Sequence, residues 1–176
     1  MAHFLPGLPG ADEYSAAFAG YVSEARGCAD PIAALEDQMV AMLALLRRVD
    51  STKRLYRYGP DKWSVQQVLG HIIDVERIFA YRALRIARAD KTPLPGFEEN
   101  DYVVAAEAER CDWNSLVAEF ECVRQASILL LKHLPDSAWT RRGTSSGATL
   151  SVRALAHIMV GHTEHHVTIL RERYLL

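Results

Sequence analysis

The chain has 176 residues, of which 49% are hydrophobic and 24% charged, so it is long enough for one well-packed core and has an ordinary globular composition. Its formal net charge of -2 provides no basic excess for a phosphate backbone or an anionic membrane surface, which argues against nucleic acid and lipid as partners. We predict a single domain over residues 1–176, in which residues 1–29 form an extension that is helical and packs on the remainder.

The cysteines and the N-terminal residues indicate the cellular compartment of the protein. Cys28, Cys111 and Cys122 are odd in number and form no Cys-x-x-Cys pair, which argues against a disulfide framework or a zinc knuckle. The start of the chain lacks a basic segment followed by a continuous apolar run, and no stretch approaches the roughly 18 consecutive apolar residues of a membrane span. A cytoplasmic protein is expected.

Two helices are predicted in the first third of the chain. The segment "ADEYSAAFAGYVSEA", residues 11–25, would place Tyr14 and Phe18 on one face. The second helix begins after Asp30, which can cap it, with Pro31 in its first turn. Its apolar residues recur at alternating spacings of three and four, as in a helix-bundle seam: Ile32, Leu35, Met39, Met42, Leu46 and Val49.

Two further amphipathic segments follow. "WSVQQVLGHIIDVERIFAYRALRIAR" opens with Ser64 and, three residues later, Gln67, the pattern of a capping box, so this helix is predicted to begin near Val65. Residues 89–111 could cross the whole length of a bundle and let the flanking helices run parallel. The next helix begins after Asp112 and ends before Pro135.

The last helix is predicted from about Leu150 to Tyr174, with Thr149 or Ser151 as its cap. Its seam positions are Val152, Leu155, Met159, His162, His166 and Ile169. Residues 135–150 are polar and contain two glycines, which indicates a surface loop. Because no strand-like alternation of useful length is present, the predicted class is all-α, a four-helix bundle with a possible extra N-terminal helix.

Histidines on the seams are the candidate functional residues. His162 and His166 are four residues apart, so their side chains leave nearly the same helix face, with Cβ atoms roughly 5–6 Å apart. His71 occupies a seam position of an earlier helix. Burying polar groups without partners costs on the order of 1–3 kcal/mol each, and a divalent ion would supply a partner for every ring. We therefore predict a metal site formed by His71, His162 and His166.

Other roles for these three histidines are also compatible with the sequence. The three rings could instead hydrogen-bond one another or buried carboxylates such as Asp74 and Glu76 in a structural polar network. Three protein nitrogens leave one position of a tetrahedral ion open, where water could be activated or a substrate oxygen or sulfur could bind. Asp74 could orient a ring or such a water, Glu164 is expected to face solvent, and His165 to flank the site.

Other polar and aromatic residues are expected to have ordinary roles. The remaining histidines, His3, His133 and His157, lie off the seams. The arginines of the helix that carries His71, together with Arg171 and Arg173, are expected to form solvated faces, although an anionic substrate group could use one or two of them. The three tryptophans, Trp63, Trp113 and Trp139, are expected to be packing anchors.

Two segments together resemble a known family. "KWSVQQVLGHIIDVERIFAYRALRIARADKTPLPGFEENDYV" and "LAHIMVGHTEHHVTILRERYL" resemble the DinB-like superfamily of YfiT-type metal-dependent hydrolases. The resemblance extends from roughly residue 30 to the end of the chain, and the carrying pattern is Trp-Ser, Gly-His-x-x-Asp and a late Gly-His-x-x-His-His. It implies an up-down-down-up bundle, often dimeric, with a divalent ion, commonly zinc or nickel, on the residues that match here, His71, His162 and His166.

The resemblance implies several functions. The first is a metal-dependent hydrolase acting on a small-molecule substrate. The second is a transferase or isomerase that uses a low-molecular-weight thiol, namely mycothiol, bacillithiol or glutathione, with the metal activating the thiolate. A further alternative, which does not come from the resemblance, is a non-catalytic, metal-stabilised binding or stress-response module. A homodimer in the cytoplasm is expected in each case.

Overall fold

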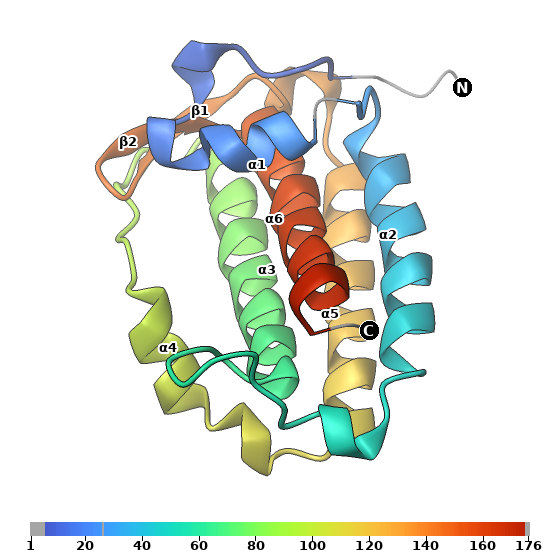
Figure 1. The fold of residues 1–176 in the computed structure, drawn as a ribbon. Coiled ribbons are helices and arrows are strands. Elements are labelled where there is room, and N and C mark those ends of the chain that lie inside the picture. The colour runs from blue at the N-terminus through green and yellow to red at the C-terminus, as the bar shows by residue number, and fades with distance from the viewer. Residues whose placement is uncertain (1–5, 26, 175–176) are drawn as a thin grey trace.

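Four long helices form the body of the protein in the computed structural model, which describes residues 6–25 and 27–174 (Figure 1). They are α2 (Pro31–Leu46), α3 (Val65–Ala87), α5 (Trp113–Lys132) and α6 (Val152–Arg173). α5 and α6 each pack against both α2 and α3, so α2 and α3 lie across the bundle from each other. The predominantly helical architecture was predicted from the sequence.

Each long helix begins at a side chain that satisfies a free backbone amide. The Asp30 carboxylate accepts two amide hydrogen bonds in the first turn of α2, and Pro31 follows it. Ser64 and Gln67 form the predicted capping box at the start of α3. Asp112 and Ser151 cap α5 and α6. Because caps are read from a few adjacent residues, all four predicted starts are confirmed.

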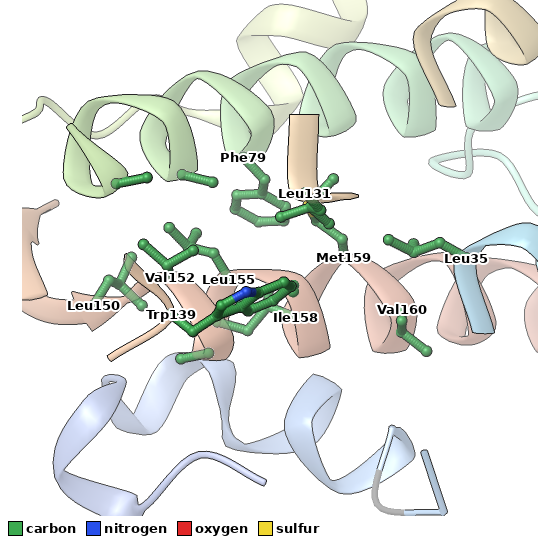
Figure 2. Packing of buried hydrophobic residues seen from close by; sticks show 14 of the residues in the cluster. Leu35, Phe79, Leu131, Trp139, Leu150, Val152, Leu155, Ile158, Met159 and Val160 are labelled. Atoms are coloured by element: carbon green, nitrogen blue, oxygen red, sulfur yellow. The ribbon is translucent and has the colours of Figure 1, made fainter. Parts of the chain in front are cut away.

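The buried apolar residues form two clusters along the bundle axis. One includes Phe79, Leu131, Leu155 and Met159, and Figure 2 shows its side chains converging between the helices. The other gathers around residues such as Phe120 of α5. On α6, the first cluster ends at residue 160 and the second begins at residue 167. The segment that carries the seam histidines therefore lies between two apolar regions.

The N-terminal region differs from the single predicted helix over residues 11–25. It forms two short 3₁₀ turns, Ala11–Glu13 and Ala16–Phe18, followed by helix α1 (Ala19–Glu24). Tyr14 and Ser15 between the turns have extended backbone angles, which interrupt the helical hydrogen bonds. α1 lies against α6, as Figure 1 shows.

Residues 142–151 form a hairpin where the sequence predicted a surface loop. Strands β1 (Arg142–Ser145) and β2 (Ala148–Ser151) pair antiparallel. Ser146 and Gly147 between them have φ angles of 52° and 75°, as a two-residue turn of the type I′ kind requires. Four-residue strands are too short to show a period-2 pattern, which explains why the all-α prediction missed this small sheet.

The long connection between α3 and α5 is also partly ordered. It contains α4 (Glu99–Ala106) and a 3₁₀ turn, Ala108–Arg110, and both lie against α3. The sequence did not predict α4, because Glu98 at its start makes no side-chain cap and the helix has only two turns. Leu94 ties the connection to the hairpin through backbone hydrogen bonds with Thr144 and Ser146.

The cysteines and the hydropathy of the helices agree with the sequence. Cys28, Cys111 and Cys122 are all free, as predicted. Within residues 6–25 and 27–174, none of the helices combines the length and apolar character needed to cross a bilayer.

Candidate metal centre

α3 and α6 bring together three histidines that are far apart in the sequence. His71 lies on α3, and His162 and His166 lie one turn apart on α6, which packs against α3. Their exposed fractions are 3%, 4% and 7%. The prediction that these rings are buried at seam positions is therefore confirmed, and the three side chains meet inside the bundle.

The ring nitrogens of these histidines form a compact donor set. One nitrogen from each of His71, His162 and His166 lies within 4.8 Å of the others, and the Nε2 atoms of His71 and His162 are 3.1 Å apart. The buried Nε2 of His166 has no hydrogen-bond partner among the described residues. Since a buried unpaired polar atom is costly, this orphan nitrogen and its two neighbours fit a cation that three imidazoles can share.

The electrostatic environment keeps the rings neutral. Burial, together with repulsion from neighbouring histidines, lowers the pKa of His71 to about 4 and that of His166 to about 3. Burial also holds the pKa of His162 well below its usual value, with added repulsion from the other histidines. Neutral imidazole is the form that offers a lone pair to a metal, so the site is ready to bind one at neutral pH.

Aromatic side chains surround the histidines. The Trp63 ring lies 4.7 Å from the His71 ring, and Tyr21 makes an edge-on contact with His162 at 5.3 Å, measured between centroids. Phe79 also meets His162 edge-on. Trp63 is therefore more than the packing anchor that the sequence predicted, because it forms a wall of the histidine cluster.

A buried ion pair lies beside the cluster. Nη2 of Arg124 donates to Oε2 of Glu76 at 3.0 Å and to Oγ1 of Thr163 at 2.7 Å. Thr163 follows His162 directly on α6, and Glu76 lies on the helix that carries His71. Glu76 was predicted from the sequence only as one partner of the histidines, but its carboxylate is engaged by Arg124.

Two cavities reach the cluster from different sides. One has a volume of about 190 Å³ and extends to His162, and the other has a volume of about 240 Å³ and extends to His166. Both border the first residues of α4, with Glu98 and Glu99 at the first cavity and Asn100 at the second. A small molecule thus has a path to either side of the donor set.

The other candidate carboxylates and His165 lie outside the cluster. Asp74 is near Arg77, with 3.8 Å between their charged atoms, and borders a separate cavity that no seam histidine lines. Glu164 accepts a hydrogen bond from Gln38. His165 faces Glu24 on the flank. Among residues 6–25 and 27–174, no carboxylate hydrogen-bonds to His71, His162 or His166, so the predicted alternative is met only by the contact between the His71 and His162 rings.

The remaining histidines have no part in the cluster. His157 is fully buried, and its ring nitrogens lie at hydrogen-bond distance from the backbone carbonyls of Arg153 and Cys28. His133 is exposed, and His3 lies outside the described residues. These positions agree with the ordinary roles that the sequence predicted for His133 and His157.

Two comparisons place the chain among known proteins. A sequence model of the DinB superfamily matches residues 34–170, a range that includes all three seam histidines. The solved structure of YfiT from Bacillus subtilis, described as a probable metal-dependent hydrolase with an unusual four-helix bundle topology, superposes with a TM-score of 0.69. It shares 19% sequence identity, and the match covers 81% of this chain and 85% of YfiT. No curated protein matches the sequence.

Proposed function

The chain belongs to the DinB superfamily, and from this premise we propose that it is a metal-dependent hydrolase of a small substrate. His71, His162 and His166 would hold a divalent cation, zinc or nickel, because neutral imidazole nitrogens suit both ions. The observation that carries the proposal is the set of three buried ring nitrogens within 4.8 Å of one another. The description of YfiT as a probable metal-dependent hydrolase supports the same reading.

The residues around the cluster would prepare it for chemistry. When bound, a divalent ion supplies Lewis acidity, which polarises a substrate oxygen and lowers the pKa of water. Burial keeps the three rings neutral, and the ring contacts from Trp63 and Tyr21 limit the movement of His71 and His162. The substrate would enter through one of the two cavities that reach His162 and His166.

Metal analysis of protein purified without a histidine tag tests the site. We expect one divalent ion per chain in the wild type and loss of that ion in His71→Ala and His162→Ala. His165→Ala is the matched control, because it removes a neighbouring imidazole from the same motif but outside the cluster. A wild type without a stoichiometric ion, or a His71→Ala variant that keeps it, would contradict the proposal.

Turnover of small esters, amides and phosphoesters tests the reaction. We expect hydrolysis by the metal-loaded wild type, loss of hydrolysis in His162→Ala, and retention in His165→Ala. Bound metal without any turnover across such a panel would favour the non-catalytic, metal-stabilised module.

The paired cavities favour a second candidate, a thiol-dependent transferase. Separate openings at His162 and His166 would suit a reaction in which two molecules meet at one ion. A panel of electrophiles incubated with mycothiol, bacillithiol or glutathione distinguishes the two candidates. Turnover that needs no thiol would exclude the transferase.

We also infer that the four long helices follow an up-down-down-up order within one domain. The ribbons of α3 and α5 run in the same direction in Figure 1, and the segment between them, residues 88–112, spans the bundle lengthwise. This agrees with the description of YfiT as having an unusual four-helix topology.

A further inference from the structure

Arg82 is a buried cation on the inner side of α3, where the sequence predicted a solvated arginine face. Its exposed fraction is 3%, whereas Arg77 on the same helix is exposed. The Nη2 atom of Arg82 donates to the carbonyl of Pro95 at 2.9 Å and to the hydroxyl of Ser146 at 3.3 Å. Both partners are uncharged, so they satisfy one nitrogen without neutralising the guanidinium.

Arg82 lacks the counter-ion that comparable arginines have. Arg77 pairs with Glu119, Arg85 with Asp90, and the buried Arg124 with Glu76. Across residues 6–25 and 27–174, no carboxylate pairs with Arg82, and its Nε and Nη1 atoms make no hydrogen bond. Burial of a guanidinium without an opposite charge is unfavourable, so an external anion would be a fitting partner.

The surroundings of Arg82 define the kind of anion. The guanidinium carbon lies 5.9 Å from the Phe79 ring centroid and 5.8 Å from that of Phe97. The cavity of about 190 Å³ that reaches His162 is lined by Arg82 and by four aromatic rings, those of Phe18, Tyr21, Phe79 and Phe97. This volume is below the roughly 300–1,000 Å³ of drug-sized sites and therefore suits a small ligand.

The acidic residues at the same cavity limit the charge of the ligand. Glu98 and Glu99 also line it, and both are exposed. A ligand with a second negative charge would meet these carboxylates, whereas a monoanion with an apolar body can place its charge at Arg82 and its body among the rings.

We propose that Arg82 binds the anionic group of a small aromatic carboxylate in the cavity that leads to His162. The N–H groups of Nε and Nη1 lie on different edges of the guanidinium and remain free of partners among the described residues, and one of them would donate a charge-assisted hydrogen bond to a carboxylate oxygen. The inference rests on the proposed function only in treating this cavity as the substrate site, because the binding itself needs no metal.

Binding of benzoate and of its neutral isostere benzamide to tag-free, chelator-treated protein tests this assignment, by calorimetric or NMR titration. We expect the wild type to bind benzoate about tenfold more tightly than benzamide, as one charge-assisted hydrogen bond to the carboxylate would give. Arg82→Met should abolish the preference while benzamide affinity changes little, and Arg82→Lys should keep a reduced preference. Arg85→Met is the matched control, because Arg85 already has Asp90 as its partner and does not line the cavity.

The outcomes separate this role from a structural one. If Arg82 only ties Pro95 and Ser146 to α3, the variants would lose thermal stability and the benzoate preference would be absent from the wild type. Equal binding of the two compounds by the wild type, or an unchanged preference in Arg82→Met, would overturn the proposal. Should Arg82→Met fail to fold, the wild-type comparison and Arg82→Lys decide, since complete loss of the preference in a folded Arg82→Lys variant would contradict recognition by the positive charge.

The same titration repeated after zinc addition keeps the two proposals apart. A chain that prefers benzoate through Arg82 but binds no zinc would refute the metal centre alone. A chain that binds zinc through His71, His162 and His166 but shows no benzoate preference would refute the anion site alone.

Discussion

At the scale of single residues, the buried pair of Glu76 and Arg124 links all four long helices. Arg124 on α5 contacts Glu76 on α3 and Thr163 on α6, and lies 3.4 Å from both the Leu35 carbonyl and the Gln38 side chain on α2. The exposed fraction of the Arg124 side chain is 0%. Such a pair favours this alignment of the helices, because separating the two side chains would leave a buried charge without a partner.

Removal of one charge of this pair should be strongly destabilising. We expect Glu76→Gln to lower the free energy of unfolding by about 3–5 kcal/mol, because Arg124 would keep a buried charge without a partner. Urea denaturation followed by circular dichroism measures the change. Glu119→Gln, which removes an exposed partner of Arg77, is the control and should cost no more than about 1 kcal/mol. A similar loss in both variants would argue against this account.

At the scale of elements, the contact between α1 and α6 depends on Gly161. A Cβ atom at residue 161 would lie 1.9 Å from the carbonyl oxygen of Tyr21, so the backbones of the two helices approach more closely than any side chain allows. Tyr21 also contacts His162, the next residue on α6. The glycine thus sets the distance between the N-terminal segment and the histidine cluster.

Gly161→Ala should therefore displace α1. We expect a loss of about 2 kcal/mol or more, since backbone must move to relieve the clash, and faster amide exchange in residues 19–24. Gly20→Ala is the matched control, because a Cβ at this α1 position meets no atom within 4 Å and replaces glycine in a helix. That variant should be neutral or gain up to about 1 kcal/mol. Equal behaviour of the two variants would contradict the close-packing argument.

The capping box of α3 supports the helix that carries His71. Ser64→Ala removes the hydrogen bond from the Gln67 amide to Oγ of Ser64, and we expect a loss of about 1 kcal/mol. Ser64→Thr, which keeps a capping hydroxyl at this buried position, should recover part of it. Thermal unfolding monitored by circular dichroism measures both variants, and no difference between Ser64→Ala and Ser64→Thr would show that the cap contributes little.

The features that could be predicted from the sequence are those set by residues that lie close together in the chain. The caps at Asp30, Ser64 and Asp112 lie next to the turns they stabilise, and the spacing of His162 and His166 is set within one helix. Placement of His71 with them followed from its seam position and from the family resemblance.

The features that sequence missed depend on tertiary contacts. The hairpin and α4 are too short to show periodicity, and the break between Tyr14 and Ser15 has no strong local signal. Burial of Arg82 follows from the connection at Pro95 and the hairpin at Ser146 closing over it, which no pattern in α3 indicates. The role of Trp63 arises because the loop before α3 folds back on the histidines.

At the scale of the whole molecule, the buried histidines link stability to pH. In the folded chain the pKa of His71 is lowered from 6.5 to about 4 and that of His166 to about 3. The unfolded chain therefore binds more protons than the folded chain below about pH 6.5, and the free energy of unfolding falls as the pH decreases toward these values. Above about pH 7 the rings are neutral in both states and contribute no pH dependence.

Metal-free protein should accordingly lose stability in acid. We expect a loss of about 3 kcal/mol from His71 alone between pH 7 and pH 4, measured by urea denaturation across this range. His166→Gln should show a shallower dependence, because one of the protonating rings is absent. If the free energy of unfolding of His166→Gln falls equally steeply in acid, the pH dependence must come from other titratable groups.

The segment between α3 and α5 can change which ligands are selected without changing the three histidines. Residues 97–100 line the cavities that reach His162 and His166, whereas the histidines themselves come from α3 and α6. Replacement of this covering segment would thus alter which molecules enter while the donor set and the core stay intact. Part of the ligand choice is therefore encoded outside the helices that carry the histidines, so a graft of the segment from another superfamily member should change substrate preference without removing the donor set.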